Sequence, residues 1–165
     1  MFAMVKRNIK IYFRNKGAWL ASLLTVFIII GLYALFLGDQ LSKSFEGLGL
    51  DEPRLLTDSW IMAGIISIMP LSISLGAVSI VSDRSKGLIK DFYCSPVSRS
   101  KITLGYILSL ALISFVITLL GFALGEIYIV VNGGEILGFA DMLKVVGIIA
   151  IDDLAATSIV MFIAM

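Results

Sequence analysis

Three acidic residues lie within or beside long apolar stretches, where a charged side chain is energetically costly. Glu126 follows the apolar run 102–124, and Asp152 and Asp153 stand near the middle of the apolar stretch 142–165. An aspartate at the centre of a bilayer costs about 2.5 to 3.5 kcal/mol on the insertion scale, so such residues are functional candidates. Two interpretations of Asp152 and Asp153 stay open. Either they face a polar bundle interior, or the span begins later and they sit at its edge.

The usual catalytic and metal-binding patterns are absent from the sequence. It has no histidine, its single cysteine is Cys94, and it contains neither a Gly-x-x-x-x-Gly-Lys-Ser/Thr phosphate loop nor a Gly-x-Ser-x-Gly nucleophile elbow. A lone cysteine excludes an internal disulfide and gives no basis for a metal site. The net charge of +1, without a base-reading motif, gives no reason to expect nucleic acid. We therefore expect no enzyme, metal or cofactor on this chain.

The composition is typical of an integral membrane protein. Hydrophobic residues make up 59% and charged residues 15%, against roughly 45–50% and 25% in soluble domains. Residues 17–37, 60–81 and 102–124 carry no charge, and each is long enough to cross a bilayer. Pro70 should kink the second span. With residues 142–165 as a fourth candidate, the fold class is an all-α polytopic membrane bundle.

The distribution of positive charges predicts the orientation. Lys and Arg dominate the segment before the first span and the connection between the second and third. The basic residues are Lys6, Arg7, Lys10, Arg14 and Lys16 in the first segment, and Arg84, Lys86, Lys90, Arg99 and Lys101 in the second. Acids dominate the connection after the first span, namely Asp39, Glu46, Asp51, Glu52 and Asp58. Because basic loops stay cytoplasmic, we expect a multi-pass protein of the cell membrane with a cytoplasmic N-terminus.

Each basic segment contains an apolar stripe. Residues 2–13 carry apolar side chains at helical spacing and predict an interfacial helix on membrane lipid. In the second segment the stripe consists of Leu88, Ile89, Phe92 and Tyr93. It predicts a short helix ended by Pro96. This helix either lies on the membrane surface or enters a groove of a cytosolic partner.

Small residues four positions apart mark the third span. Gly121 and Gly125 form one pair, and Gly105 and Ser109 form another. Such spacing lets helices approach closely, so we expect packing within the protomer or against a second copy.

Two segments carry a resemblance to a known family. One is Lys6-Arg-Asn-Ile-Lys-Ile-Tyr-Phe-Arg-Asn-Lys-Gly-Ala18, which runs directly into an apolar helix. The other combines Asp83-Arg-Ser-Lys-Gly-Leu88 with Ser95-Pro-Val-Ser-Arg-Ser-Lys-Ile102. Over nearly its whole length the chain resembles the ABC transporter type-2 permease family, the membrane subunits of bacterial and archaeal exporters. The second motif is similar to the family's loop between helices two and three.

The resemblance implies a fold, partners and a function. It implies the N-terminal portion of a six-helix domain spanning residues 1–165, truncated before its last two helices. It also implies a second permease copy or homologous permease, and a separate ATP-binding cassette subunit that holds ATP and Mg. Leu88, Ile89, Phe92 and Tyr93 would then contact that subunit as the coupling helix.

The expected cargo of such an ATP-driven exporter is a drug, antibiotic, peptide or other small amphipathic molecule. The alternatives are a permease for polysaccharide or lipid-linked cargo, and a non-transporting membrane protein such as an immunity factor.

Overall fold

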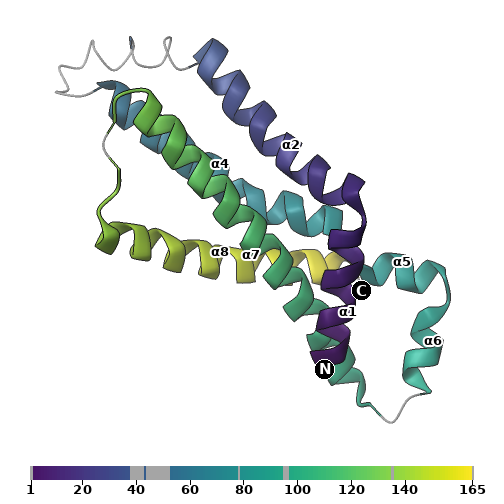
Figure 1. Ribbon diagram of the computed structural model, residues 1–165. Coiled ribbons are helices and arrows are strands. Elements are labelled where there is room, and N and C mark those ends of the chain that lie inside the picture. The colour runs from purple at the N-terminus through teal and green to yellow at the C-terminus, as the bar shows by residue number, and fades with distance from the viewer. Residues whose placement is uncertain are drawn as a thin grey trace.

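The computed structural model describes residues 2–37, 43, 53–77, 79–94, 97–134 and 136–164. Within these ranges the regular structure is helical and contains no strand, which confirms the all-α prediction (Figure 1). In chain order the elements are α1 (Phe2–Arg14), α2 (Lys16–Leu32), the π-helical η1 (Tyr33–Leu37), α4 (Pro53–Ala77), α5 (Ser79–Ser85), α6 (Leu88–Tyr93), α7 (Arg99–Val131) and α8 (Phe139–Ala164).

Three of these helices are long and apolar enough to cross a membrane, namely α4, α7 and α8. The first predicted span, residues 17–37, is divided between α2 and η1, because its last turns are π-helical. It passes the same test only together with α1, from which it is bent by 64°. The described part of the chain therefore offers three spans, or four with the bent pair.

The helix ends and the ends of the predicted apolar stretches do not coincide, and α4 stops at Ala77, before the predicted end of the second span at residue 81. Helix α7 continues to Val131, and α4 begins at Pro53 and runs through Pro70 without a break. Charged residues such as Asp58 thus lie inside a helix and not in a loop. Much of the predicted acidic loop, including Asp39, Glu46, Asp51 and Glu52, lies outside the described residues, as do Ser95 and Pro96.

The core forms around α7, which packs against α1, α4 and α8. Its buried Ile113 and Ile117 meet Val26 of α2, Met69 of α4 and Val160 of α8 in one apolar cluster. Figure 1 shows α8 crossing α7 near the middle of both helices. The side chains of the long apolar runs therefore make the contacts that hold the bundle together.

Three of the small residues on α7 face methionine side chains of neighbouring helices. A Cβ added at Gly121 would overlap the terminal methyl group of Met69, and one at Gly125 would lie 3.3 Å from Met62 Sδ. A Cβ at Gly105 would lie 3.3 Å from the Cβ of Met4 on α1. A methyl group at Gly121 would therefore require the end of the buried Met69 side chain to move.

Two turns depend on glycine. Gly87, between α5 and α6, has φ +75°, a left-handed conformation that glycine adopts without strain. Gly133 has φ +91° and ends α7, where its N–H donates to Val130 and that of Gly134 donates to Ile129. This pair of bonds is a Schellman motif. Gly87 thereby permits the turn between α5 and α6.

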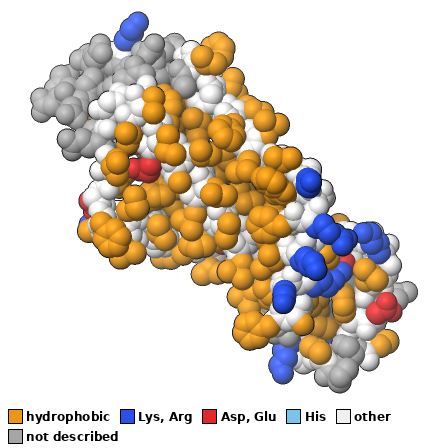
Figure 2. Space-filling model, in the orientation of Figure 1, with side chains coloured by type: hydrophobic (Ala, Val, Ile, Leu, Met, Phe, Trp, Pro, Cys, Tyr) orange, Lys and Arg blue, Asp and Glu red, His pale blue; other side chains and the backbone are white. Residues whose placement is uncertain are grey.

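The surface separates apolar from basic side chains. In Figure 2 hydrophobic groups cover most of the visible face, and most visible lysines and arginines gather at one end. Helices α1 and α5 lie at this end (Figure 1), and their sequences contain Lys6, Lys10 and Arg84. The extended apolar face suits contact with lipid or with further protein.

Candidate functional site

Helices α1 and α5 meet through an ion pair. The guanidinium of Arg7 donates to both oxygens of the Asp83 carboxylate, with N–O distances of 2.8 and 2.9 Å. Asp83 is only 5% exposed, and Arg7 is partly covered. Two parallel charge-assisted bonds fix the relative direction of the side chains as well as their separation. The short helix α5 is therefore held against α1.

A second pair of contacts joins the same place to α7. The hydroxyl of Tyr106 donates to Asp83 at 2.6 Å, and the amide of Asn8 donates to the Ser109 hydroxyl at 3.0 Å. Both Asn8 and Ser109 are 2% exposed. We call the group formed by Arg7, Asn8, Asp83, Tyr106 and Ser109 the junction. It links three helices through polar side chains that are buried, apart from the partly exposed Arg7.

Phe92 of α6 packs against the junction. The guanidinium carbon of Arg7 lies 5.3 Å from the centre of the Phe92 ring, within the range of a cation–π contact. The ring also packs against the cluster of Ile102, Tyr106 and Met161. Phe92 is therefore half-buried inside the subunit, so it does not present its whole ring to a partner.

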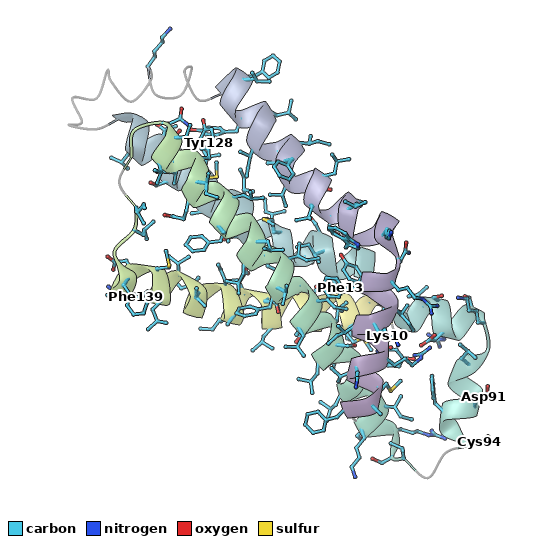
Figure 3. The ribbon with its side chains drawn as sticks, viewed as in Figure 1. Lys10, Phe13, Asp91, Cys94, Tyr128 and Phe139 are labelled. Carbon is cyan, nitrogen blue, oxygen red and sulfur yellow. The ribbon has the colours of Figure 1, made fainter. Side chains whose placement is uncertain are left out.

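The other described side chains in and just after α6 differ in exposure. Leu88, one helical turn before Phe92, is half-buried, and Asp91 and Cys94 are exposed. Figure 3 shows Asp91 and Cys94 on the side of α6 away from α1. The side chains of Ile89 and Tyr93 lie outside the described residues.

The junction controls the charge of Asp83. Burial alone would raise the pKa of this carboxyl, but hydrogen bonds from Arg7 and Tyr106, together with the charges of Arg7 and Lys86, lower its pKa below the ordinary value. The bond to Asp83 also raises the pKa of Arg7. Both groups therefore stay ionised at neutral pH.

A sequence profile of the family described as ABC-2 type transporter matches residues 1–165. The chain belongs to the ABC-2 type transporter family. It is a multi-pass membrane permease, a transport component that is not itself catalytic. Permeases of this family generally work with an ATP-binding cassette subunit, which supplies the ATP and Mg. No curated protein and no solved structure matches the chain.

The acidic residues of the permease spans occupy different surroundings. Asp153 is 2% exposed in the middle of α8 and accepts a hydrogen bond from Ser114 of α7. Asp152 is half-buried. Glu126 accepts from the backbone N–H of Leu137 at 3.4 Å, across the connection between α7 and α8. Asp153 is thus the one of these three that joins two spans through its side chain.

Sequence reasoning missed several residues of these sites. Asn8 is one polar residue on the buried face of α1, between Val5 and Tyr12, and this interruption is a signal in the sequence. Asp58 is also buried and accepts from the Tyr33 hydroxyl at 2.5 Å, which joins α4 to η1. The partners of these groups lie in distant segments, so their pairing has no local pattern.

Proposed function

We propose that this permease is the membrane subunit of an ATP-driven exporter, with α1, α5 and α6 on the cytoplasmic side of the cell membrane. Its cargo is a small amphipathic molecule such as a drug, an antibiotic or a peptide. Helix α6 docks on the cassette subunit as the coupling helix, with Leu88, Ile89, Phe92 and Tyr93 as the contacts. A second permease copy or a homologous permease completes the transporter.

The observation that carries this proposal is the contact between Phe92 and Arg7. Because Arg7 also holds Asp83, and Asp83 accepts from Tyr106, a displacement of α6 acts on α1 and α7 together. A helix that lay passively on lipid would need no such connection. With α6 docked on the cassette subunit, the junction would carry a displacement of α6 to the membrane-spanning helix α7.

The charge distribution supports the orientation. Basic residues of α1 and of α5 gather at the same end of the bundle, which is the pattern of cytoplasmic segments (Figure 2). Lipid phosphates of the inner leaflet would attract the exposed Lys6 and Lys10 of α1.

Two classes of variant distinguish binding of the cassette subunit to α6 from transmission of its movement through the junction. In the complete transporter, Arg7→Ala breaks the junction and leaves the residues of α6 unchanged. We expect the cassette subunit to co-purify normally and to hydrolyse ATP, while export falls about tenfold. Arg7→Lys keeps the charge but loses the two-point contact. Its export rate should lie between those of the wild type and Arg7→Ala. Leu88→Ala with Phe92→Ala should instead reduce co-purification itself.

Arg14→Ala is the matched control, because Arg14 is an exposed arginine at the end of the same helix. It should export at the wild-type rate. Wild-type export by Arg7→Ala would contradict transmission through the junction. Normal complex formation and transport by the Leu88/Phe92 double variant would contradict the docking role of α6.

A further inference from the structure

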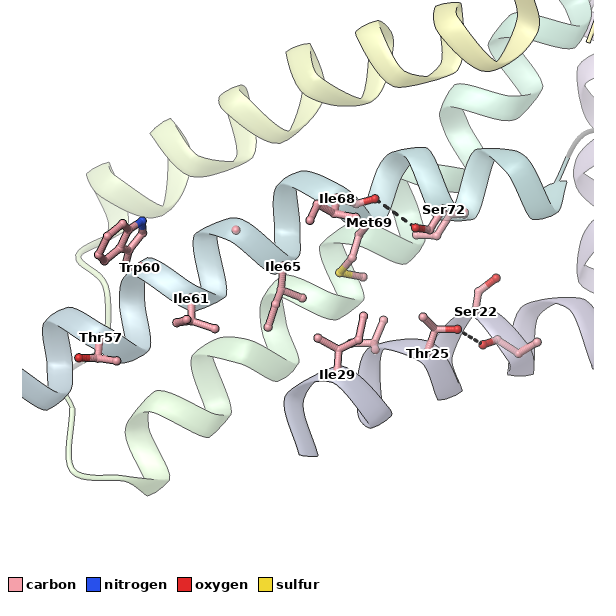
Figure 4. Close-up of a pocket in the computed structure, with 14 residues that line it drawn as sticks. Ser22, Thr25, Ile29, Thr57, Trp60, Ile61, Ile65, Ile68, Met69 and Ser72 are labelled. Carbon is pink, nitrogen blue, oxygen red and sulfur yellow. Dashed lines mark hydrogen bonds between the residues drawn. The ribbon is translucent and has the colours of Figure 1, made fainter. Parts of the chain in front are cut away.

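A cleft of about 940 Å³ separates α2 from α4 (Figure 4). Its volume lies at the upper end of the range for small-molecule pockets, about 300 to 1,000 Å³. Trp60 and Ile68 on its rim are 67% and 63% exposed, so the cleft is open to the surroundings. The lining comes from the membrane-spanning part of α4 and the apolar part of α2.

The cleft has an apolar floor that belongs to the core. Val26, Met69 and Ile73 line it and are at most 4% exposed. They form one cluster with Ile113 and Ile117 of α7. The floor is therefore fixed by the packing of three helices.

The cleft is largely apolar, and its wall carries a few polar groups but no charged residue. None of its fourteen lining residues is Asp, Glu, Lys, Arg or His, and four carry hydroxyl groups: Ser22, Thr25, Thr57 and Ser72. Ligand sites combine apolar walls with a few polar groups, and the cleft has this composition. An ionised ligand would find no counter-charge here and would lose its hydration.

Two of these hydroxyls have defined hydrogen-bonding roles. Thr25 donates to the Ala21 carbonyl at 2.9 Å, and Ser72 donates to the Ile68 carbonyl at 3.4 Å. Each hydroxyl has one proton, so what remains for a ligand is the acceptor side of its oxygen. A complementary ligand therefore presents a hydrogen-bond donor.

We propose that the cleft between α2 and α4 is a cargo-binding site for an uncharged, largely apolar small molecule that carries at least one N–H or O–H donor. This assignment rests on the proposed export function and adds to it the place and the chemical class of the cargo.

The test uses two probes that share one ring system. N-phenyl-1-naphthylamine is uncharged and has one N–H donor, and 8-anilinonaphthalene-1-sulfonate adds a sulfonate to it. Radiolabelled probe is bound to the complete permease with its cassette subunit in lipid nanodiscs, without ATP, and binding to empty nanodiscs is subtracted. We expect the uncharged probe to bind at least tenfold more tightly than the sulfonate.

Gly64→Phe is the blocking variant. Gly64 lines the cleft, and a Cβ there would meet no atom within 4 Å, so the ring can enter the cleft without a clash at its base. We expect at least a tenfold loss of affinity for the uncharged probe. Gly147→Phe is the matched control, because Gly147 on α8 is equally open and does not line the cleft. It should bind the probe as the wild type does.

A second variant serves where Gly64→Phe fails to assemble with the cassette subunit. Thr25→Val with Ser72→Ala removes two acceptors with little change of shape. It should weaken binding of N-phenyl-1-naphthylamine several-fold and leave its N-methyl derivative, which has no donor, unaffected.

Unchanged probe binding by Gly64→Phe would overturn the assignment and leave the cleft to a lipid chain or to another segment of protein. Equal binding of the sulfonate would overturn the chemical class. A complex that binds the probe in the cleft but does not export it would contradict the proposed function and not the binding site.

Discussion

Arg7 and Asp83, 76 positions apart in the sequence, meet through two hydrogen bonds between their charged groups. This ion pair connects a helix before the first predicted span to a helix after the second. Removal of one partner leaves the other charge partly buried without compensation, which is costlier than loss of an exposed pair.

A charge exchange tests this pairing. Arg7→Asp or Asp83→Arg alone should destabilise the permease by about 3 kcal/mol, because like charges then face each other. The double exchange should recover part of this loss, with a coupling energy of about 1 to 3 kcal/mol. It cannot recover all of it, since an arginine at position 83 no longer accepts from Tyr106. Thermal unfolding of the four proteins in detergent measures the coupling, and strictly additive losses would argue against the ion pair.

The pH dependence of stability follows from the lowered pKa of Asp83. A carboxyl with a lowered pKa in the folded state contributes stability above its unfolded pKa, and this contribution is lost as the pH falls through the folded pKa. The difference in stability between wild type and Asp83→Asn should therefore be constant from about pH 8 to pH 5 and should shrink below about pH 4. A difference that shrinks already near neutral pH would show that another group controls the junction.

Gly121→Ala tests the close contact between α7 and α4. The added methyl group would overlap the end of the buried Met69 side chain, so we expect a loss of about 1 to 3 kcal/mol. Shortening the neighbour in Gly121→Ala with Met69→Ala should make the combined loss smaller than the sum of the single losses. Gly147→Ala, at an open site on α8, should be neutral or stabilising by up to about 1 kcal/mol. A larger loss at Gly147 than at Gly121 would contradict this packing.

Asp153 and Asp152 should differ in their effects on transport. Asp153→Asn keeps a group that accepts from Ser114, and we expect it to preserve stability and export. Asp153→Leu removes that contact between α7 and α8 and should impair export without preventing membrane insertion. Asp152→Leu is the neighbouring control and should have the smaller effect. Export rates in vesicles decide the comparison, and an undiminished rate for Asp153→Leu would leave this contact without a role in transport.

Cys94 is a native reporter for the orientation of α6, because it is exposed just after that helix. In a complete permease with Cys94 as its sole cysteine, a membrane-impermeant maleimide should label inverted vesicles and not sealed cells. Binding of the cassette subunit should slow the labelling. Modification in sealed cells would reverse the proposed orientation.

The sequence predicts the helices well because the bilayer imposes a simple length and polarity requirement. Residues 60–81, 102–124 and 142–165 each fall largely on helices. The ends are predicted less well for the second span, because α4 begins at Pro53, includes Asp58 and ends at Ala77, whereas the predicted stretch is 60–81. A helix does not stop where hydrophobicity stops, because its backbone hydrogen bonds continue into polar surroundings.

Side-chain partners could not be predicted in the same way. The spacing of Gly121 and Gly125 predicts a close approach, but it does not identify Met69 and Met62 as the neighbours. The apolar stripe on α6 predicts a short helix, but it does not identify Arg7 as the neighbour of the Phe92 ring within the subunit. Such pairings depend on how distant helices are oriented, and a local pattern carries no information about that.

A hydrogen bond of 2.9 Å between the hydroxyls of Tyr12 and Ser22 spans the bend between α1 and α2. Tyr12 is 6% exposed among core residues, and Ser22 lies in the wall of the cleft. The hydrogen bond therefore connects α1 and α2 across the bend and couples their relative orientation. A tilt of α1 would therefore either break this hydrogen bond or move Ser22 and the adjoining wall of the cleft with it.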